Sequence, residues 1–178
     1  MGRETDNQKR VTLLAGLGAI GLSAVGARYY ATRPRPPAGG AVRVRYKDLA
    51  PGTLRSVEWL GRIVFVLRRS PADLYALSEH ESELIDPGSE QSLQPPGCQN
   101  RHRSLLPELF VAIGQCTHQG CTPTLRVSKD GKGEFICPCH TSRYDLAGRV
   151  FRAGPAPANL IIPEYSLTED GNLVVGES

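Results

Sequence analysis

Six residues that can bind a transition metal stand in two short clusters of this 178-residue chain. Each cluster holds two cysteines and one histidine, and the members are Cys116, His118 and Cys121 in the first and Cys137, Cys139 and His140 in the second. Thiolate and imidazole groups at such short spacing are typical of metal sites. Each cluster follows an apolar run and enters a turn, marked by Gly114 and Gly120 in the first cluster and by Pro138 in the second. Two such loops facing each other would form a compact pocket at one end of a β-sheet.

Three kinds of chemistry compete for these side chains. A zinc ion could take two cysteines and two histidines, but structural zinc sites usually use cysteine pairs, and zinc would leave two cysteines unexplained. Two disulfides would leave both histidines unused. A mixed-ligand 2Fe-2S cluster takes thiolates on one iron and imidazoles on the other. This third interpretation uses every residue if Cys121 and Cys139 join the two loops as a disulfide, and the residue types favour it.

The two loops resemble those of the Rieske iron–sulfur subunits of ubiquinol–cytochrome c reductase. The resemblance extends over nearly the whole chain and includes the segments WLGRIVFVLRRSP at 59–71 and DLAGRVFRAGPAPANL at 145–160. It implies one 2Fe-2S cluster of the Rieske type, whose ligands would be Cys116, His118, Cys137 and His140. It also implies a disulfide between Cys121 and Cys139.

The same resemblance assigns supporting roles around the cluster. Ser142 and Tyr144 match the serine and tyrosine that donate hydrogen bonds to cluster sulfurs in the family. Gly154 and Pro155 match the start of a Gly-Pro-Ala-Pro loop that covers the cluster. Hydrogen bonds to sulfur stabilise the reduced cluster, and replacing thiolates by neutral imidazoles removes negative charge, so we expect a high reduction potential.

The resemblance implies that the chain is part of an enzyme, a proton-translocating complex that oxidises quinol. The cluster would accept an electron from quinol while His118 or His140 takes up the proton, and a c-type cytochrome would receive the electron. Cytochrome b, a c-type cytochrome and a second copy of the complex are the implied partners. Two alternatives share such loops: the small Rieske subunit of an arsenite-oxidase-like enzyme, and a Rieske ferredoxin, which would need neither the extra cysteines nor a membrane anchor.

Two positions in the loops depart from the pattern of the family. Gln119 stands where respiratory members usually carry leucine at the quinol-facing tip, and Thr141 stands where the second loop usually has glycine. Neither departure removes a ligand, but both lie close to the cluster, so we expect them to affect quinol docking or the reduction potential. The fifth cysteine, Cys98, follows Pro96-Gly97 and is predicted to be a loop thiol without a role.

The N-terminal region predicts a membrane anchor. Residues 1–10 are polar and end in Lys9-Arg10, which stands in place of a twin arginine, and the following residues carry no charge up to Ala27. We expect a cytoplasmic segment at 1–10, one transmembrane helix at 11–30 and a Pro- and Gly-rich flexible hinge at 31–41. A cleaved signal peptide is the alternative. Because a disulfide persists only in an oxidising compartment, the head is expected in the periplasm, on the cell inner membrane.

From residue 42 onward the sequence predicts a mainly β head. Alternating or apolar runs bounded by turn residues predict strands near 42–46, 54–60, 63–67, 109–114, 124–127, 134–136, 165–168 and 173–175. Asp130-Gly131 and Asp170-Gly171 predict two hairpins. We expect a Rieske-type antiparallel β-sandwich over 42–178 with a cluster-binding subdomain inserted at about 107–157. The net charge of +3 is too small, and the basic residues too scattered, for a nucleic-acid-binding protein.

Overall fold

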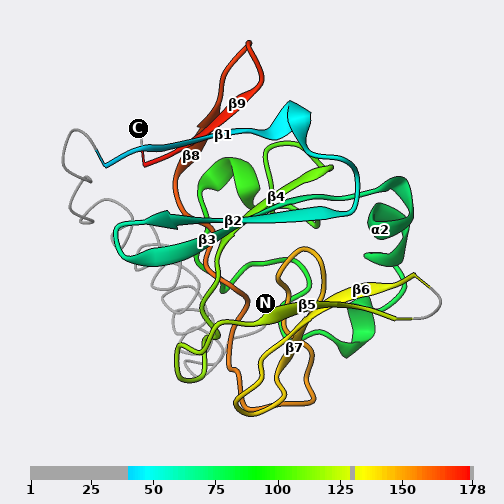
Figure 1. Cartoon of the computed structure of the whole chain (residues 1–178). Helices are drawn as coiled ribbons and strands as arrows, with labels where there is room; N and C mark the ends of the chain where they lie inside the picture. The colour runs from blue at the N-terminus through cyan, green and yellow to red at the C-terminus, as the bar shows by residue number, and fades with distance from the viewer. Residues whose placement is uncertain (1–39, 129–130, 177–178) are drawn as a thin grey trace, which may run out of the picture. The chain divides into compact units, whose positions relative to one another are not determined.

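The computed structural model describes residues 40–128 and 131–176, and this part of the chain is mainly β (Figure 1). Its strands pair antiparallel into three sheets of three strands each. The predicted fold class, mainly β with antiparallel sheets, is confirmed. The expected anchor at 11–30 and nearly all of the hinge at 31–41 lie outside the described residues. Within the described ranges, no helix has the length and apolar character needed to cross a membrane.

The first sheet joins the two ends of the head. It has the order β1 (Val42–Arg45), β9 (Asn172–Val175) and β8 (Tyr165–Leu167). Val44 lies opposite Leu173 and both are buried. The turn between β8 and β9 is the Asp170-Gly171 hairpin that the sequence predicts, and strand β1 lies against β2 of the next sheet.

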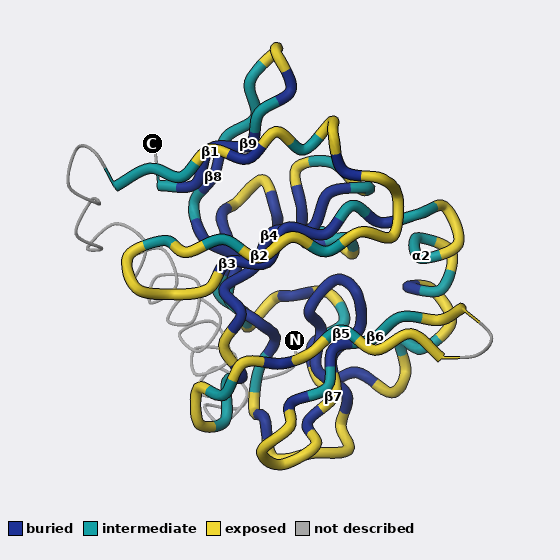
Figure 2. The backbone as a smooth tube through the Cα atoms, viewed as in Figure 1, coloured by how far each residue is buried: buried dark blue, intermediate teal, exposed yellow. Residues whose placement is uncertain are grey.

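The second sheet forms the middle layer of the head. Its order is β2 (Thr53–Trp59), β3 (Arg62–Arg68) and β4 (Leu109–Ile113). The whole of β4 and the middle of β3 are buried, which explains why both read as continuous apolar runs rather than as alternating strands. Figure 2 shows these strands as dark blue segments between the other two sheets.

The third sheet is contributed by the segment of chain between β4 and β8. Its order is β5 (Thr124–Val127), β6 (Gly133–Ile136) and β7 (Arg143–Tyr144). Phe135 of β6 stacks on Phe65 of β3 with the ring centroids 5.3 Å apart. This contact fixes the third sheet on the middle layer, and the loops at one end of the third sheet carry the metal-binding residue types.

Short helices connect the sheets: η1 (Tyr46–Asp48), α2 (Pro71–Ala76), η2 (Glu81–Glu83) and η3 (Pro96–Cys98). Helix α2 begins with a capping box, in which the Ser70 hydroxyl accepts from the Asp73 amide and the Asp73 carboxylate accepts from the Ser70 amide. Cys98 differs from the predicted loop thiol, because it ends η3 and is fully buried. Its Sγ lies 3.7 Å from the Tyr165 hydroxyl, so it packs as part of the core.

Candidate metal centre

The first candidate loop follows strand β4 and turns back on itself. The Cys116 amide donates to the Cys121 carbonyl at 2.8 Å, and the Gly120 amide donates to the Cys116 carbonyl at 2.9 Å. Gly120 has a φ of +80°, a conformation that glycine adopts without steric cost. The loop is therefore a closed turn that holds Cys116, His118 and Cys121 near the end of the sheet.

The second candidate loop follows strand β6 and closes in a similar way. The Thr141 amide donates to the Cys137 carbonyl at 3.0 Å, and the Cys137 amide donates to the Ser142 carbonyl at 2.9 Å. Because strand β7 begins directly after this turn, the loop is held between two paired strands. Its cysteines and His140 thus have a fixed backbone position.

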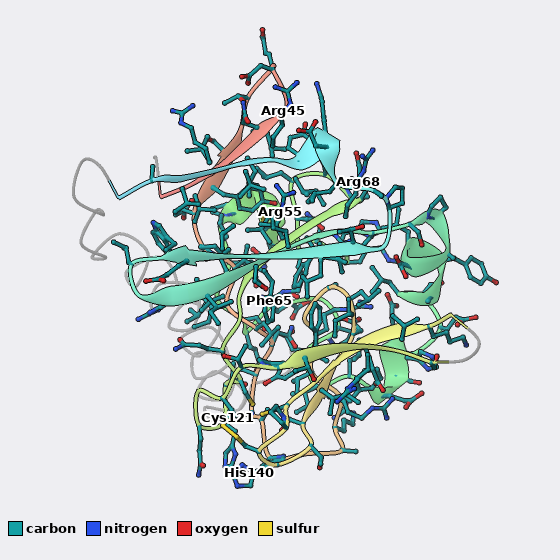
Figure 3. All side chains as sticks on the ribbon, viewed as in Figure 1. Arg45, Arg55, Phe65, Arg68, Cys121 and His140 are labelled. Atoms are coloured by element: carbon teal, nitrogen blue, oxygen red, sulfur yellow. A yellow bond between two sulfur atoms is a disulfide. The ribbon has the colours of Figure 1, made fainter. Side chains whose placement is uncertain are left out.

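A disulfide between Cys121 and Cys139 joins the two loops, with the Cα atoms 6.5 Å apart. Figure 3 shows this bond in yellow beside His140, at the end of the head away from β9. The Sγ atoms of Cys121, Cys137 and Cys139 lie within 4.8 Å of one another. These three sulfurs are not a ligand set, because two of them are joined in the disulfide and have no thiolate to offer.

Cys116 and Cys137 are free thiols and are almost completely buried, with 3% and 1% of their surface exposed. Burial by itself raises the pKa of the Cys116 thiol, but hydrogen bonds to its sulfur from Tyr144 and from the His118 amide outweigh burial, so the pKa is lowered. The Tyr144 hydroxyl donates to Cys116 Sγ at 3.2 Å. The pocket therefore favours a thiolate at Cys116, the form that binds iron.

His118 and His140 lie together, on the same two loops as these thiols. Their ring centroids are 4.7 Å apart and the rings are nearly perpendicular, at 80°. His118 is half-buried, and its Nδ1 atom is buried with no hydrogen-bond partner in the described part of the chain. His140 is exposed. A buried ring nitrogen without a partner beside two buried thiols fits a metal ligand, so the donor set suits a 2Fe-2S cluster.

Tyr144 is held in place by Thr117, a residue that the sequence did not single out. The Tyr144 hydroxyl accepts from the Thr117 amide at 3.1 Å, while the Thr117 hydroxyl donates to the Ala158 carbonyl at 2.7 Å. Burial, followed by the hydrogen bond to Cys116, raises the pKa of Tyr144. The Tyr144 hydroxyl therefore stays protonated and donates a hydrogen bond to Cys116 Sγ.

The loop that begins with Gly154 and Pro155 packs directly on the second candidate loop. Ser142 is fully buried, and its hydroxyl oxygen accepts from the Ala156 amide at 3.1 Å. Gly154 has a φ of +146°, and a Cβ added there would lie 3.0 Å from the Ser142 Cα. Only glycine permits this close approach. Pro155 next to it is exposed.

Three buried arginines anchor the chain directly after Tyr144. Arg149 donates to the Asp145 carboxylate at 2.7 Å, while Arg69 and Arg103 donate to backbone carbonyls within residues 146–148. Burial lowers the pKa of Arg69 to about 10, far above neutral, so it stays charged. These arginines fix the segment that follows Tyr144. Their burial could not be predicted from the sequence, because arginine is mostly exposed in proteins.

The sequence comparisons identify the domain that contains these side chains. A model of the Rieske [2Fe-2S] domain matches residues 101–166. The chain is 43% identical to the ubiquinol-cytochrome c reductase iron-sulfur subunit of Allochromatium vinosum, over 97% of this chain and 90% of that protein. The chain belongs to the Rieske iron–sulfur subunit family. Its cofactor is one 2Fe-2S cluster of the Rieske type.

Another curated relative is matched over only about half of its own length. The chain is 40% identical to the mitochondrial cytochrome b-c1 complex subunit Rieske-4 of Nicotiana tabacum, over 76% of this chain but 52% of that protein. A solved structure titled "Hyperthermophilic respiratory Complex III" contains a chain that is 25% identical, with a TM-score of 0.48; the alignment covers 92% of this chain and 98% of that one.

The two departures from the family pattern lie at the surface of this Rieske subunit. Gln119 and Thr141 are both exposed, each next to a histidine of the site. Thr141 has a φ of +57°, in the left-handed region that β-branched residues seldom adopt. The second loop therefore keeps a backbone conformation suited to glycine, although the residue is threonine.

Proposed function

We propose that this chain is the electron-transfer subunit of a ubiquinol–cytochrome c reductase, which takes an electron from quinol and passes it to a c-type cytochrome. One observation carries the proposal: two loops joined by a disulfide bring two buried thiols and two neighbouring histidines into one site, and one of the histidines is exposed. Quinol can approach such a site from the histidines while the sulfurs stay shielded from water.

In this proposal the cysteines bind iron only, whereas the histidines bind iron and also take up a proton. Cys116 and Cys137 bind one iron, and His118 and His140 bind the other. A bound 2Fe-2S cluster takes up and releases a single electron. Because the buried Nδ1 of His118 serves as its ligand atom, its Nε2 remains to take the proton of the quinol. His140, being exposed, is open to the same proton.

The neighbouring residues set the potential and shield the site. Tyr144 donates to Cys116 Sγ, which stabilises the added negative charge of the reduced state. The Ser142 hydroxyl oxygen accepts a hydrogen bond from the Ala156 amide. The hydroxyl hydrogen of Ser142 is then available to donate to a sulfur of the cluster. Gly154 and Pro155 cover the second loop, where Gly154 lies against Ser142.

The membrane arrangement is also part of this proposal. Residues 1–10 are cytoplasmic, residues 11–30 span the inner membrane once, and residues 31–41 form the hinge. The head, residues 42–178 with a cluster-binding subdomain at about 107–157, lies in the periplasm, where its disulfide is stable. Cytochrome b and a c-type cytochrome are the partners, within a dimeric complex.

Electron paramagnetic resonance of membranes containing the full chain tests this function. The reduced membranes should give a Rieske-type signal that titrates with one electron at high potential. An inhibitor of the quinol site in cytochrome b should change the shape of this signal, because it would contact the exposed histidine. A Rieske signal that purifies away from every b-type cytochrome would contradict the proposal and favour one of the alternative Rieske proteins.

A further inference from the structure

One free thiol of the metal centre lies next to its disulfide. Cys137 Sγ is within 4.8 Å of the Sγ atoms of both Cys121 and Cys139. Cys137 is a free thiol, and it lies on the same short loop as Cys139. A thiol that adjoins a disulfide has the partner that thiol–disulfide exchange requires. Cys116, the other free thiol of the site, does not belong to this group of sulfurs.

We propose that Cys137 exchanges with the Cys121–Cys139 disulfide whenever the cluster is not bound, and that the bound cluster preserves the native pairing. The inference rests on the proposed role of Cys137 as a cluster ligand. A sulfur held by iron is not available as a nucleophile. The same sulfur, left free within 4.8 Å of the disulfide, needs only a small movement of its loop to reach it.

The exchange conserves electrons and needs no oxidant. The Cys137 thiolate attacks Cys121 Sγ, the Cys121–Cys139 bond breaks, and Cys139 leaves as a thiolate that takes up the proton lost by Cys137. Attack on Cys139 instead would close a small ring through Pro138 and would separate the two loops. Attack on Cys121 keeps the loops joined, so it is the favoured product. The released Cys139 is exposed.

The product of this exchange cannot bind the cluster, because Cys137 is now part of a disulfide and no longer offers a thiolate to iron. The bound cluster therefore protects the disulfide, and the native disulfide leaves Cys137 free to bind the cluster. A chain that forms its disulfide before it receives iron and sulfide would drift into the inactive pairing. Loading would then require a thiol reductant to restore Cys137.

Two variants that both lack the cluster test the exchange, because they differ in the thiol that they keep. Cys116→Ser retains Cys137, whereas Cys137→Ser removes it. Each full-length chain is held without oxygen, alkylated with iodoacetamide while folded, then unfolded and treated with a second reagent of different mass. Digestion without reduction identifies the disulfide and the labelled cysteine. Buried Cys98 reports whether each variant is folded.

We expect Cys116→Ser to contain a Cys121–Cys137 disulfide and to show at least about tenfold more labelling of Cys139 than Cys137→Ser, which should keep the native pair. The parental chain should protect Cys139 while loaded and release it after the iron is removed by a chelator. The comparison of the loaded and the chelated parental chain still tests the exchange if a variant does not fold. Iron content and the resonance signal of the loaded parental chain test the proposed function separately.

Two results would overturn the exchange. In the first, Cys116→Ser and the chelated parental chain both retain the Cys121–Cys139 pair. In the second, the chelated chain forms a Cys116–Cys137 bond beside an intact native disulfide, because that product arises by oxidation and not by exchange.

Discussion

Cys116 and Cys137 on one side of the metal centre are 3% and 1% exposed, whereas His140 on the other side is exposed and His118 is half-buried. We call these the thiol side and the histidine side. The thiol side is surrounded by protein, and Cys116 Sγ receives a hydrogen bond from Tyr144. In the proposed function this side sets the charge and potential of the cluster, and the open histidine side is where the electron donor and its proton arrive.

The backbone around the two sides differs in the same way. The segment behind the thiol side is fixed by buried ionic contacts, of which the 2.7 Å bond between Arg149 and Asp145 is one. The histidine side ends in surface turns, and one of them places Thr141 in a left-handed conformation. Loss of a ligand on either side should remove the cluster. Loss of a hydrogen bond on the thiol side should alter the reduction potential, and changes in the surface turns of the histidine side should alter partner contact or local stability.

The largest effect is expected from removing a ligand on the histidine side. His140→Ala should abolish the cluster, because one iron would lose half of its protein ligands. The loss is measured as the disappearance of the Rieske resonance signal together with iron. His80→Ala is the matched control, because His80 is a surface histidine paired with Glu83 and should leave the signal intact. A loaded cluster in His140→Ala would remove this histidine from the ligand set.

A smaller effect is expected from opening the disulfide between the loops. The bridge joins residues 18 apart in sequence, and closing a loop of this size contributes about 3 kcal/mol to stability. Cys121→Ser should therefore bind a cluster that is lost faster to a chelator and at a lower temperature. Its iron content should exceed that of Cys116→Ser. Equal and complete loss of iron in both variants would mean that the disulfide cysteines are as necessary as the ligands.

A redox effect without loss of the cluster is expected on the thiol side. Tyr144→Phe removes the hydroxyl that donates to Cys116 Sγ. Bonds to charged groups are worth about 1.5–3 kcal/mol, which is about 65–130 mV for one electron. This bond is stronger to the more negative reduced state but is not absent from the oxidised state, so its loss should lower the midpoint potential by part of that amount, roughly tens of millivolts. Potentiometric titration of the resonance signal measures the shift.

Tyr165→Phe is the control for this redox prediction. The Tyr165 hydroxyl accepts from the Leu105 amide and lies beside Cys98, so its loss should affect stability but not potential. Equal potential shifts in both variants would show that a buried hydroxyl acts through general packing. An unchanged potential in Tyr144→Phe would contradict the role of its hydrogen bond.

The sequence predicted the parts of this molecule that depend on local spacing. The Cys and His spacing predicted a mixed-ligand site, and the turn residue pair Asp170-Gly171 predicted a hairpin that the structure contains. The N-cap at Ser70 was also predictable, because a capping box is a contact between residues three apart. The two loops with metal-binding side chains do come together, because the disulfide between Cys121 and Cys139 joins them.

Contacts between distant segments were not predictable. Arginine is seldom buried, and buried Arg69 finds its partners far away in sequence, at Ser104 and at the Leu146 carbonyl. Cys98 looked like a loop thiol because its partner Tyr165 lies in the last hairpin. Thr117 could have been noticed only through its contact with Tyr144, which requires both loops to be folded.

The smallest effect is expected on the histidine side, at Thr141. Its left-handed backbone, with a φ of +57°, costs a residue with a Cβ about 1–2 kcal/mol. Glycine avoids this cost but loses about 0.5–1 kcal/mol through its greater freedom in the unfolded chain. Thr141→Gly should therefore stabilise the head by a net amount of about 1 kcal/mol or less, which raises the melting temperature by about 2–4 °C at most.

Thr122 provides the matched control for Thr141, because it is also an exposed threonine in a loop but does not have a positive φ. Among the described residues other than glycine, a positive φ occurs at Leu60, Ser89, Arg103 and Thr141. Thr122→Gly gains nothing from strain relief and should lower the melting temperature. Opposite signs for the two variants in thermal unfolding would show that the second loop stores backbone strain beside His140. A lower melting temperature in both would mean that Thr141 stabilises the loop through its side chain.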